Sequence, residues 1–198
     1  YGHHLAANEK TYFRRAMQLQ CRLPQFYAAP KVHKTPWKTR PIVSCVNSTL
    51  GYLSKWIDRQ LQRVVHLCPG YLKDSTSLLQ NLRQMDPLPP STIIIIADAV
   101  SMYTNIDTPH GIQTLKAWLA LHKADLPSGF PTGMVLAATE LVMTYNVFQF
   151  DDTFWLQISG TAMGTPTACT FATIYYAYHE ETSYLRKYHA THQMTPAT

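Results

Sequence analysis

The feature that most constrains the fold is the run at residues 93–97, four isoleucines and an alanine followed directly by Asp98. It is the longest strongly apolar stretch of the chain, whereas a membrane-spanning helix needs about 20 apolar residues in a row. We therefore expect no membrane span. Short apolar runs between polar residues are typical of buried β-strands, and we expect residues 93–100 to form one.

Other segments repeat apolar residues at helical spacing or begin with a helix-capping residue. Asp74 can cap a helix that places Leu78, Leu82 and Met85 on one face. Such patterns predict helices at residues 12–20, at 50–67, after Asp74, after Asp107 or Thr108 (with Ile112, Leu115 and Leu119 on one face), at 134–145 and at 167–187.

Two pairs of strands are expected from alternation around polar turns. Residues 26–32 and 40–46 should form a ribbon, and residues 147–150 and 153–158 a hairpin that turns at Asp151-Asp152. Helices and short strands mix without a regular βαβ repeat, which predicts an α+β fold. Three prolines at 87, 89 and 90 predict a boundary between residues 1–90 and residues 91–198.

Charge is distributed unevenly along the chain. Lys and Arg number 17 against 12 Asp and Glu, a net charge of +5. Residues 1–90 contain thirteen basic residues and four acidic ones, so this half can contact a polyanion.

The four cysteines lack C-x-x-C spacing and are expected to be free thiols. The chain starts at Tyr1 without a signal peptide, and we expect a piece of a longer intracellular protein, with the nucleus as one candidate compartment.

Asp98 and Tyr103 are candidates for chemistry. An acid at the end of a buried strand can bind a metal ion, and phosphoryl-transfer enzymes hold two divalent ions with such carboxylates. Alternatively, Asp98 only caps a turn. Tyr103, five residues on, can stand beside a nucleotide sugar, or it is an ordinary core tyrosine.

The ribbon and a glycine-containing loop are two further candidates. The cations of the ribbon can close over a triphosphate, or they form a solvated basic turn; they are Lys31, His33, Lys34, Lys38 and Arg40. Residues 160–168 contain Gly160 and Gly164 and open a helix, so their backbone can approach a base or a phosphate. The loop has no Walker A spacing.

Two acidic motifs are better explained without chemistry. Asp151-Asp152 looks like a metal-binding pair, but it lies in the turn of the predicted hairpin. His179-Glu180-Glu181 has the H-x-E pattern of zinc deaminases, but no P-C-x-x-C follows it.

Four stretches in this order resemble the reverse transcriptase domain of retroelements, and most closely that of Penelope-like elements. Together they span roughly residues 20–180 and read FYAAPKVHK (26–34), RPIVS (40–44), ADAVSMYTNI (97–106) and GTAMGTP (160–166). The resemblance implies the fingers and an incomplete palm of a right-hand polymerase, with fingers at residues 1–90 and a partial palm at residues 91–198.

The resemblance also assigns roles to single residues. Asp98 resembles the first catalytic carboxylate and, with the carbonyl of Ala99, a ligand of two Mg²⁺ ions. Tyr103 falls at the steric gate that excludes ribonucleotides. Lys31, Lys34 and Arg40 resemble the cations that grip the incoming triphosphate, and Gly164 the glycine beside the nascent base pair. Met163 stands where retroviral enzymes have Gln.

One departure from the family is large. The aromatic-x-Asp-Asp motif that supplies the remaining metal ligands should follow the last helix, yet no Asp occurs after Lys187. The final catalytic strands and the thumb are therefore missing from these residues. The function implied is an RNA-directed DNA polymerase whose partners are a primed RNA or DNA template and dNTPs. The alternative is a decayed or repurposed domain that binds nucleic acid without catalysis. We expect the chain alone to lack polymerase activity.

Overall fold

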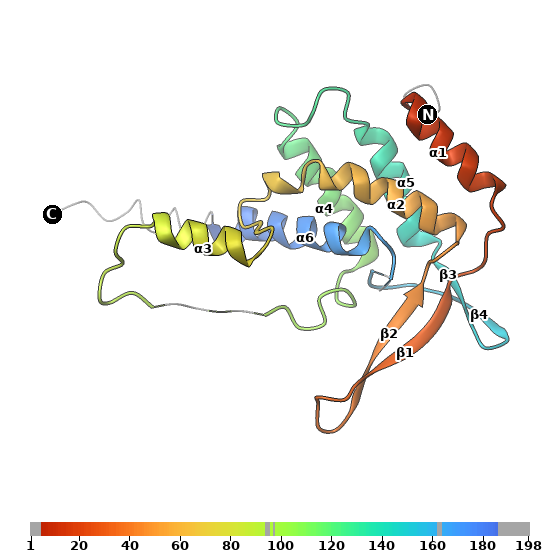
Figure 1. Cartoon of the computed structure of the whole chain (residues 1–198), viewed down its shortest axis with the longest axis horizontal. Helices are drawn as coiled ribbons and strands as arrows, with labels where there is room; N and C mark the ends of the chain where they lie inside the picture. The colour runs from red at the N-terminus through yellow and green to blue at the C-terminus, as the bar shows by residue number, and fades with distance from the viewer. Residues whose placement is uncertain (1–4, 94–95, 97, 162–163, 186–198) are drawn as a thin grey trace.

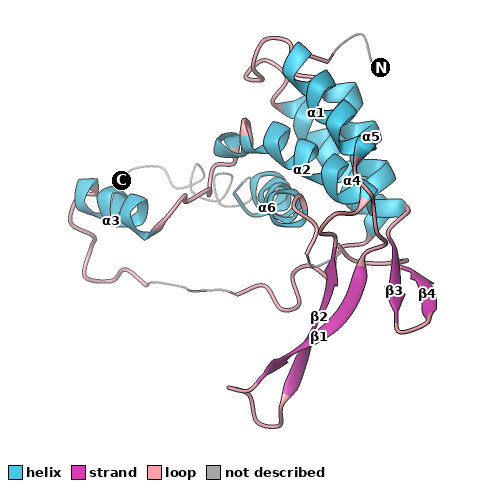
Figure 2. Ribbon diagram, turned by 45° about the vertical axis from the view of Figure 1, so that its right-hand side comes forward, coloured by secondary structure: helices cyan, strands magenta, loops and turns pink. Residues whose placement is uncertain are grey.

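The computed structural model describes residues 5–93, 96, 98–161 and 164–185. Five helices gather into one body, and a four-stranded sheet projects from one side of it (Figures 1 and 2). The sixth helix, α3 (Ser75–Gln84), stands apart from the body in Figure 2. The fold is therefore a mixture of helices and a small mixed sheet, as the predicted α+β class requires. In this described part, no helix is both long and apolar enough to cross a membrane.

The core of the body is formed by four helices: α2 (Thr49–Gln62), α4 (Thr108–Leu121), α5 (Thr132–Thr144) and α6 (Ala168–His179). Its largest fully buried side chains include Ile57 and Leu61 from α2, Trp118 from α4 and Phe171 from α6. The core thus takes residues from both sides of the boundary predicted near residue 90. A short 3₁₀ helix, Val65–Leu67, continues α2, so the helix predicted at 50–67 is confirmed with a break near its end.

The predicted cap of α4 is confirmed. The carboxylate of Asp107 accepts a hydrogen bond from the backbone amide of His110 at 2.9 Å, and Pro109 occupies the first turn. Both features satisfy or remove the backbone donors that a helix start leaves unpaired. Leu115 and Leu119 are buried, as their spacing predicted.

Helix α1 (Ala7–Gln18) is fixed to α2 by one carboxylate. Glu9 accepts hydrogen bonds from the indole of Trp56 at 2.8 Å and from the amide of Gln60 at 2.7 Å. Its other oxygen accepts from the backbone amide of Ala6. The first helix was predicted at residues 12–20, and it begins earlier because Glu9 closes this cap.

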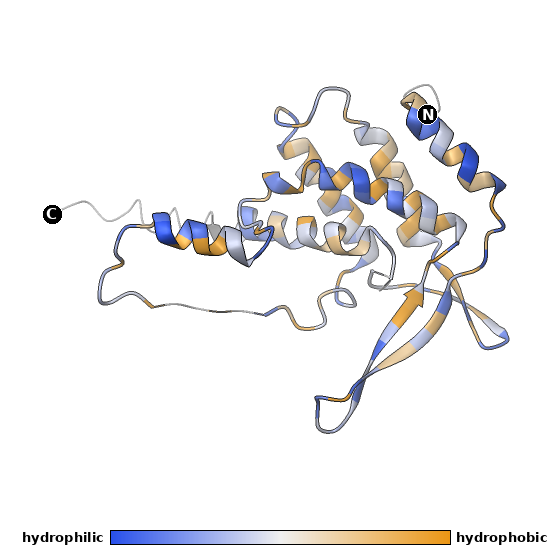
Figure 3. Cartoon of the chain, in the orientation of Figure 1, coloured by the Kyte–Doolittle hydropathy of each residue, from blue (hydrophilic) through white to orange (hydrophobic). Residues whose placement is uncertain are grey.

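Helix α3 has the predicted cap, but the part of the chain that the structure describes does not bury its apolar face. Asp74 accepts from the backbone amide of Ser77 at 2.8 Å. The apolar residues of the helix alternate with hydrophilic ones in Figure 3, and no residue of α3 is buried. Leu78, Leu82 and Met85 are all exposed.

Both predicted strand pairs are confirmed. Strands β1 (Gln25–Lys31) and β2 (Lys38–Ser44) form an antiparallel ribbon, and β3 (Val147–Phe150) and β4 (Thr153–Leu156) form the hairpin. The order across the sheet is β2-β1-β3-β4, with β1 and β3 parallel. Phe26 and Phe148 pack against the buried side chain of Val43 at the base of the ribbon.

The strand predicted at residues 93–100 is wrong for the described residues of that segment. Ile93, Ile96 and Val100 belong to no strand and are 82%, 92% and 80% exposed; residues 94, 95 and 97 lie outside the described residues. A β-strand is stabilised by backbone hydrogen bonds to a neighbouring strand. None of the four described strands pairs with this segment, so its apolar residues have no sheet to join.

The last helix differs in form from its prediction. Residues 167–187 were expected to be one helix, whereas α6 ends at His179 and a π-helical stretch, Glu180–Leu185, continues it. The predicted residues 186 and 187 lie outside the described residues.

Candidate functional site

The glycine loop lies directly against strand β2. Gly164 has a φ of 111°, a conformation that side chains rarely permit, and an added Cβ would lie 2.5 Å from the carbonyl oxygen of Val43. Only glycine allows the two backbones to approach so closely. The loop and the ribbon, about 120 residues apart in sequence, therefore meet at this point.

The start of the same loop holds the turn that carries Tyr103. Gly160 has a φ of 76°, and a Cβ there would lie 2.9 Å from the Cα of Thr104. The backbone amide and the hydroxyl of Thr161 donate to the carbonyl of Tyr103 at 2.7 and 3.1 Å. The amide of Gly160 donates to the carbonyl of Ile106 at 3.1 Å. Three separate stretches of the chain thus converge: strand β2, the turn at 103–106 and the glycine loop.

The side chain of Tyr103 is half-buried, and it packs against the edge of the helical core. Burial raises the pKa of its phenol, and a hydrogen bond and charge interaction with the thiol of Cys169 raise it further. The ring is therefore neutral at physiological pH. This placement is compatible with a gate beside a bound sugar and also with a partly buried core residue, the two alternatives that the sequence left open.

The basic ribbon extends away from the helical body (Figure 1). Lys31 and Lys38 are directly opposite in its register, and Arg40 faces Ala29 further toward the base. Both ion pairs found in the described part of the chain are made by His122, with Asp125 and Glu181, so the ribbon cations have no ion-pair partner there.

The turn of the ribbon adds an aromatic side chain to these cations. Trp37 lies between Lys34 and Lys38 in the chain and is 75% exposed. Like charges held opposite one another, as Lys31 and Lys38 are, repel. A polyanion relieves this repulsion, and an exposed indole beside it offers a stacking surface for a base.

Asp98 and Ala99 lie in a different place. They line a cavity of about 400 Å³ beside α6, together with Met102, Tyr176 and Glu180. The hydroxyl of Tyr176 donates to the carbonyl of Met102 at 3.0 Å and fixes this wall.

The donors at Asp98 suit Mg²⁺ only in part. The carboxylate of Asp98, the carbonyl of Ala99 and the carboxylate of Glu180 are oxygen donors, which Mg²⁺ prefers. Across residues 5–93, 96, 98–161 and 164–185, no group of three His, Cys, Asp or Glu side chains could hold a metal ion. Asp98, Ala99 and Glu180 are therefore not a sufficient ligand set for two ions, and further oxygen ligands would be needed.

The structure brings together some of the predicted residues and separates others. Tyr103 and Gly164 lie on the two ends of one junction, and Arg40 is three residues from Val43 on the strand that Gly164 touches. Lys31 and Lys34 are at the far end of the ribbon. Met163 lies outside the described residues.

Sequence reasoning missed three residues of this region: Thr161, Cys169 and Glu180. Cys169, Thr173, Tyr176 and Glu180 are spaced by four, three and four residues, which places them on one face of a helix. That spacing could have indicated that these four residues share one face, but not that this face lies beside Tyr103 and Asp98. The Thr161 bond to Tyr103 leaves no signal in the sequence.

No family model matches the chain, and no curated protein matches it.

Proposed function

We propose that this chain is the nucleotide- and template-binding part of an RNA-directed DNA polymerase. In the reaction, the 3′-hydroxyl of a primer attacks the α-phosphate of a dNTP and pyrophosphate leaves. Such phosphoryl transfer depends on positioning and on charge stabilisation more than on covalent chemistry. The right-hand polymerase architecture, with fingers at 1–90 and a partial palm at 91–198, belongs to the same proposal.

The observation that supports the proposal most is the junction of β2, the Tyr103 turn and the glycine loop. The resemblance assigns these three stretches to one nucleotide site, although about 60 residues separate each from the next along the chain. Gly164 lies on the carbonyl of Val43, and Thr161 holds the carbonyl of Tyr103. A fold that brought them to different surfaces would have removed the basis for the proposal.

The proposed roles follow the positions of the side chains. The uncompensated cations of the ribbon attract the triphosphate and the phosphates of the template. Tyr103 excludes a 2′-hydroxyl by the volume of its ring, and the glycine loop lets the backbone approach the base pair. Asp98 and the carbonyl of Ala99 would hold Mg²⁺, which when bound stabilises the charge on the transferring phosphate.

One observation favours a second candidate, a domain that binds nucleic acid without catalysis. Asp98 lies in the cavity beside Glu180 and Tyr176, whereas Tyr103 and Gly164 lie at the junction with β2. This separation supports a domain in which the junction and the ribbon bind nucleic acid and the Asp98 carboxylate takes no part in catalysis.

The ribbon's part in the proposal is tested by equilibrium binding of a fluorescein-labelled primed template. The variant replaces Lys31, Lys34, Lys38 and Arg40 by Gln. Its control removes the same charge types elsewhere, by replacing Lys73, Arg83, Lys116 and Lys123 by Gln. Because phosphate contacts release counterions, affinity should fall as salt rises.

Ribbon neutralisation should weaken binding and flatten the salt dependence, whereas the control should change both much less. Equal loss in the two variants would show that net charge and not the ribbon is responsible. Binding that survives ribbon neutralisation would overturn the proposed role of the ribbon.

A further inference from the structure

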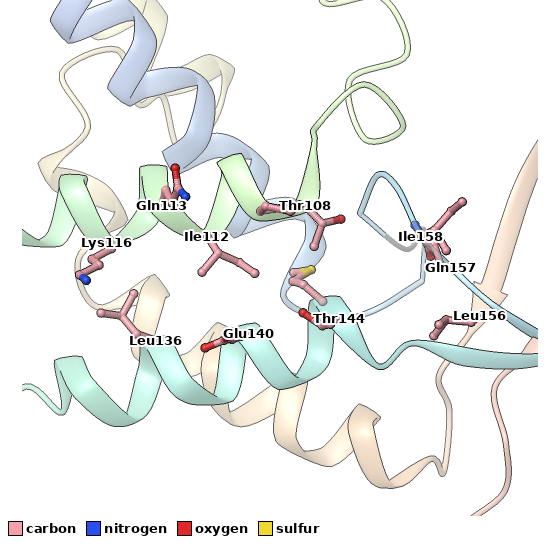
Figure 4. A pocket seen from close by; sticks show the side chains of 12 residues that line it. Thr108, Ile112, Gln113, Lys116, Leu136, Glu140, Thr144, Leu156, Gln157 and Ile158 are labelled. Atoms are coloured by element: carbon pink, nitrogen blue, oxygen red, sulfur yellow. The ribbon is translucent and has the colours of Figure 1, made fainter.

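A second cavity lies between α4 and α5, next to residues 156–158, which lead into the glycine loop. It has a volume of about 660 Å³, within the range of about 300–1,000 Å³ that is typical of small-molecule sites. Ile112 of α4 and Leu136 of α5 point into the space between the helices (Figure 4), and Met143 and Leu156 add to its apolar lining. Side chains of this kind favour an apolar ligand.

Two charges of opposite sign stand at this cavity. Lys116 comes from α4 and Glu140 from α5, and both point toward the space between the helices (Figure 4). Both side chains are exposed, and neither takes part in the ion pairs found within the described residues. The two charges sum to zero, so the lining carries no net charge to attract an ion. The site therefore disfavours a multiply charged nucleotide and favours a net-neutral molecule.

The end of the cavity is attached to the glycine loop. Gln157 lines it, and its amide nitrogen donates to the carbonyls of Ser159 and Gly160, both at 2.9 Å. The hydroxyl of Thr108, which also lines the cavity, donates to the carbonyl of Gly160 at 3.5 Å. A molecule in the cavity would therefore touch the two side chains that hold Gly160.

We infer that this cavity binds a small, mainly apolar, net-neutral molecule, and that its occupation is coupled to the glycine loop through Gln157 and Thr108. The backbone amide of Thr161, next to Gly160, donates to the carbonyl of Tyr103. A shift of this segment on ligand binding would therefore move Tyr103 at the proposed nucleotide junction. The inference on binding requires neither nucleotide binding nor catalysis.

Two probes with the same aromatic body test the ligand class. N-phenyl-1-naphthylamine is neutral, and 8-anilino-1-naphthalenesulfonate carries one added sulfonate. Both fluoresce more strongly in apolar sites. The neutral probe should bind saturably and about tenfold more tightly, a difference of about 1.4 kcal/mol. Equal affinities, or tighter binding of the sulfonate, would contradict the proposed selectivity.

The location of the probe is read from methionine methyl groups labelled with ¹³C. Met143 lines this cavity, Met102 the one beside Asp98, and Met17 an apolar cavity between α1 and α2. The neutral probe should shift the Met143 signal first. A shift of Met17 or Met102 without Met143 would overturn the inference.

Filling the cavity provides the matched variants. Leu136→Trp should lower the affinity for the neutral probe by about tenfold or more. Leu121→Trp, at an exposed leucine of α4 outside the cavity, should leave that affinity unchanged. If Leu136→Trp fails to fold, Ile112→Phe fills the same space with less added volume. Unchanged affinity in a folded filling variant would contradict the assignment.

The coupling is measured on the amide signals of Gly160 and Thr161. Both should shift as the probe saturates Met143, and Gln157→Leu, which keeps most of the side-chain volume, should reduce those shifts while Met143 still responds. Thr108→Val tests the same link if Gln157→Leu does not fold. Loop amides that do not respond to saturating probe would overturn the coupling, even if binding in the cavity holds.

Discussion

The carbonyl of Tyr103 accepts two hydrogen bonds from one residue, the backbone amide of Thr161 at 2.7 Å and its hydroxyl at 3.1 Å. This pair fixes the turn that carries the proposed gate against the loop that contains Gly164. Because Gly164 in turn touches Val43, the position of the ring is tied to the base of the ribbon. The nucleotide junction proposed for this chain depends on these two contacts.

The first prediction concerns Gly164. Gly164→Ala forces a side chain to adopt a φ of 111° and to approach the carbonyl of Val43. Backbone strain of this kind costs about 1–3 kcal/mol, and the steric clash adds to it. We expect a clear loss of unfolding free energy in urea titrations.

The control for that prediction is Gly133 in α5, where an added Cβ meets nothing within 4 Å. Gly133→Ala should stabilise the chain by about 0.5–1 kcal/mol, because alanine loses less backbone entropy in a helix. Equal effects of the two substitutions would show that the loop does not pack closely on β2.

The second prediction concerns the cysteines. Burial raises the pKa of Cys45 to about 11, and burial together with the charges of Glu181 and Glu180 raises the pKa of Cys68 to about 12. Cys21 and Cys169 are exposed. Because the thiolate is the reactive form, Ellman's reagent at pH 8 should modify the two exposed thiols rapidly and the two buried ones only after unfolding.

The same shifts have a consequence for stability. The folded chain keeps the Cys45 and Cys68 thiols protonated. Their contribution to the free energy of unfolding is therefore complete below the ordinary pKa of 9.0 and is lost as pH rises through about 11 to 12.

The control for the Ellman experiment is a Cys21→Ser, Cys169→Ser variant, which should show no rapid reaction. Rapid modification in that variant would contradict the burial of the other two.

The third prediction concerns Trp37. If a base stacks on its exposed ring, Trp37→Ala should reduce the binding free energy for single-stranded RNA or DNA by about 1–3 kcal/mol. Trp37→Phe should retain part of that binding free energy, because its ring can still stack. The salt dependence should not change, because no charge is removed. Trp155, also exposed at 54% but on β4, provides the control. A similar loss in Trp155→Ala would remove the special role of the ribbon turn.

The fourth prediction concerns catalysis by residues 1–198 alone. In-line transfer uses two metal ions about 3.5–4 Å apart, and the described residues supply no group of three metal-binding side chains. We expect no template-dependent dNTP incorporation above the level of an Asp98→Ala control. Incorporation that exceeds this control would show that the chain completes a two-ion site.

The sequence predicted the elements that local chemistry determines. The Asp107 cap, the hairpin around Asp151-Asp152 and the ribbon were all correct because their turn and capping residues act on near neighbours. The strand at residues 93–100 was wrong because hydrophobic patterning cannot say whether a partner strand is paired with it. Helix α3 shows the same limit, since its apolar face was predicted correctly but is not buried by the residues that the structure describes.

The candidate site was only partly predictable for a related reason. A glycine pattern indicates close backbone approach, but it does not identify Val43 as the neighbour. The bond from Thr161 to Tyr103 joins residues 58 positions apart, and only the folded chain brings them together. The separation of Asp98 from Tyr103 along α6 likewise depends on packing and not on the motif that contains both.

The central claim, that Tyr103 stands at a nucleotide site, is tested most directly by comparing the binding of dUTP and UTP. The two differ only in the 2′-hydroxyl, and saturation-transfer NMR measures both without requiring catalysis. The unmodified chain and Tyr103→Phe should prefer dUTP, because the ring and not its hydroxyl does the excluding. Tyr103→Ala should lower that preference by about tenfold, or about 1.4 kcal/mol. An unchanged dUTP/UTP ratio in Tyr103→Ala, together with a lower melting temperature, would show that Tyr103 is a core residue and would contradict the claim.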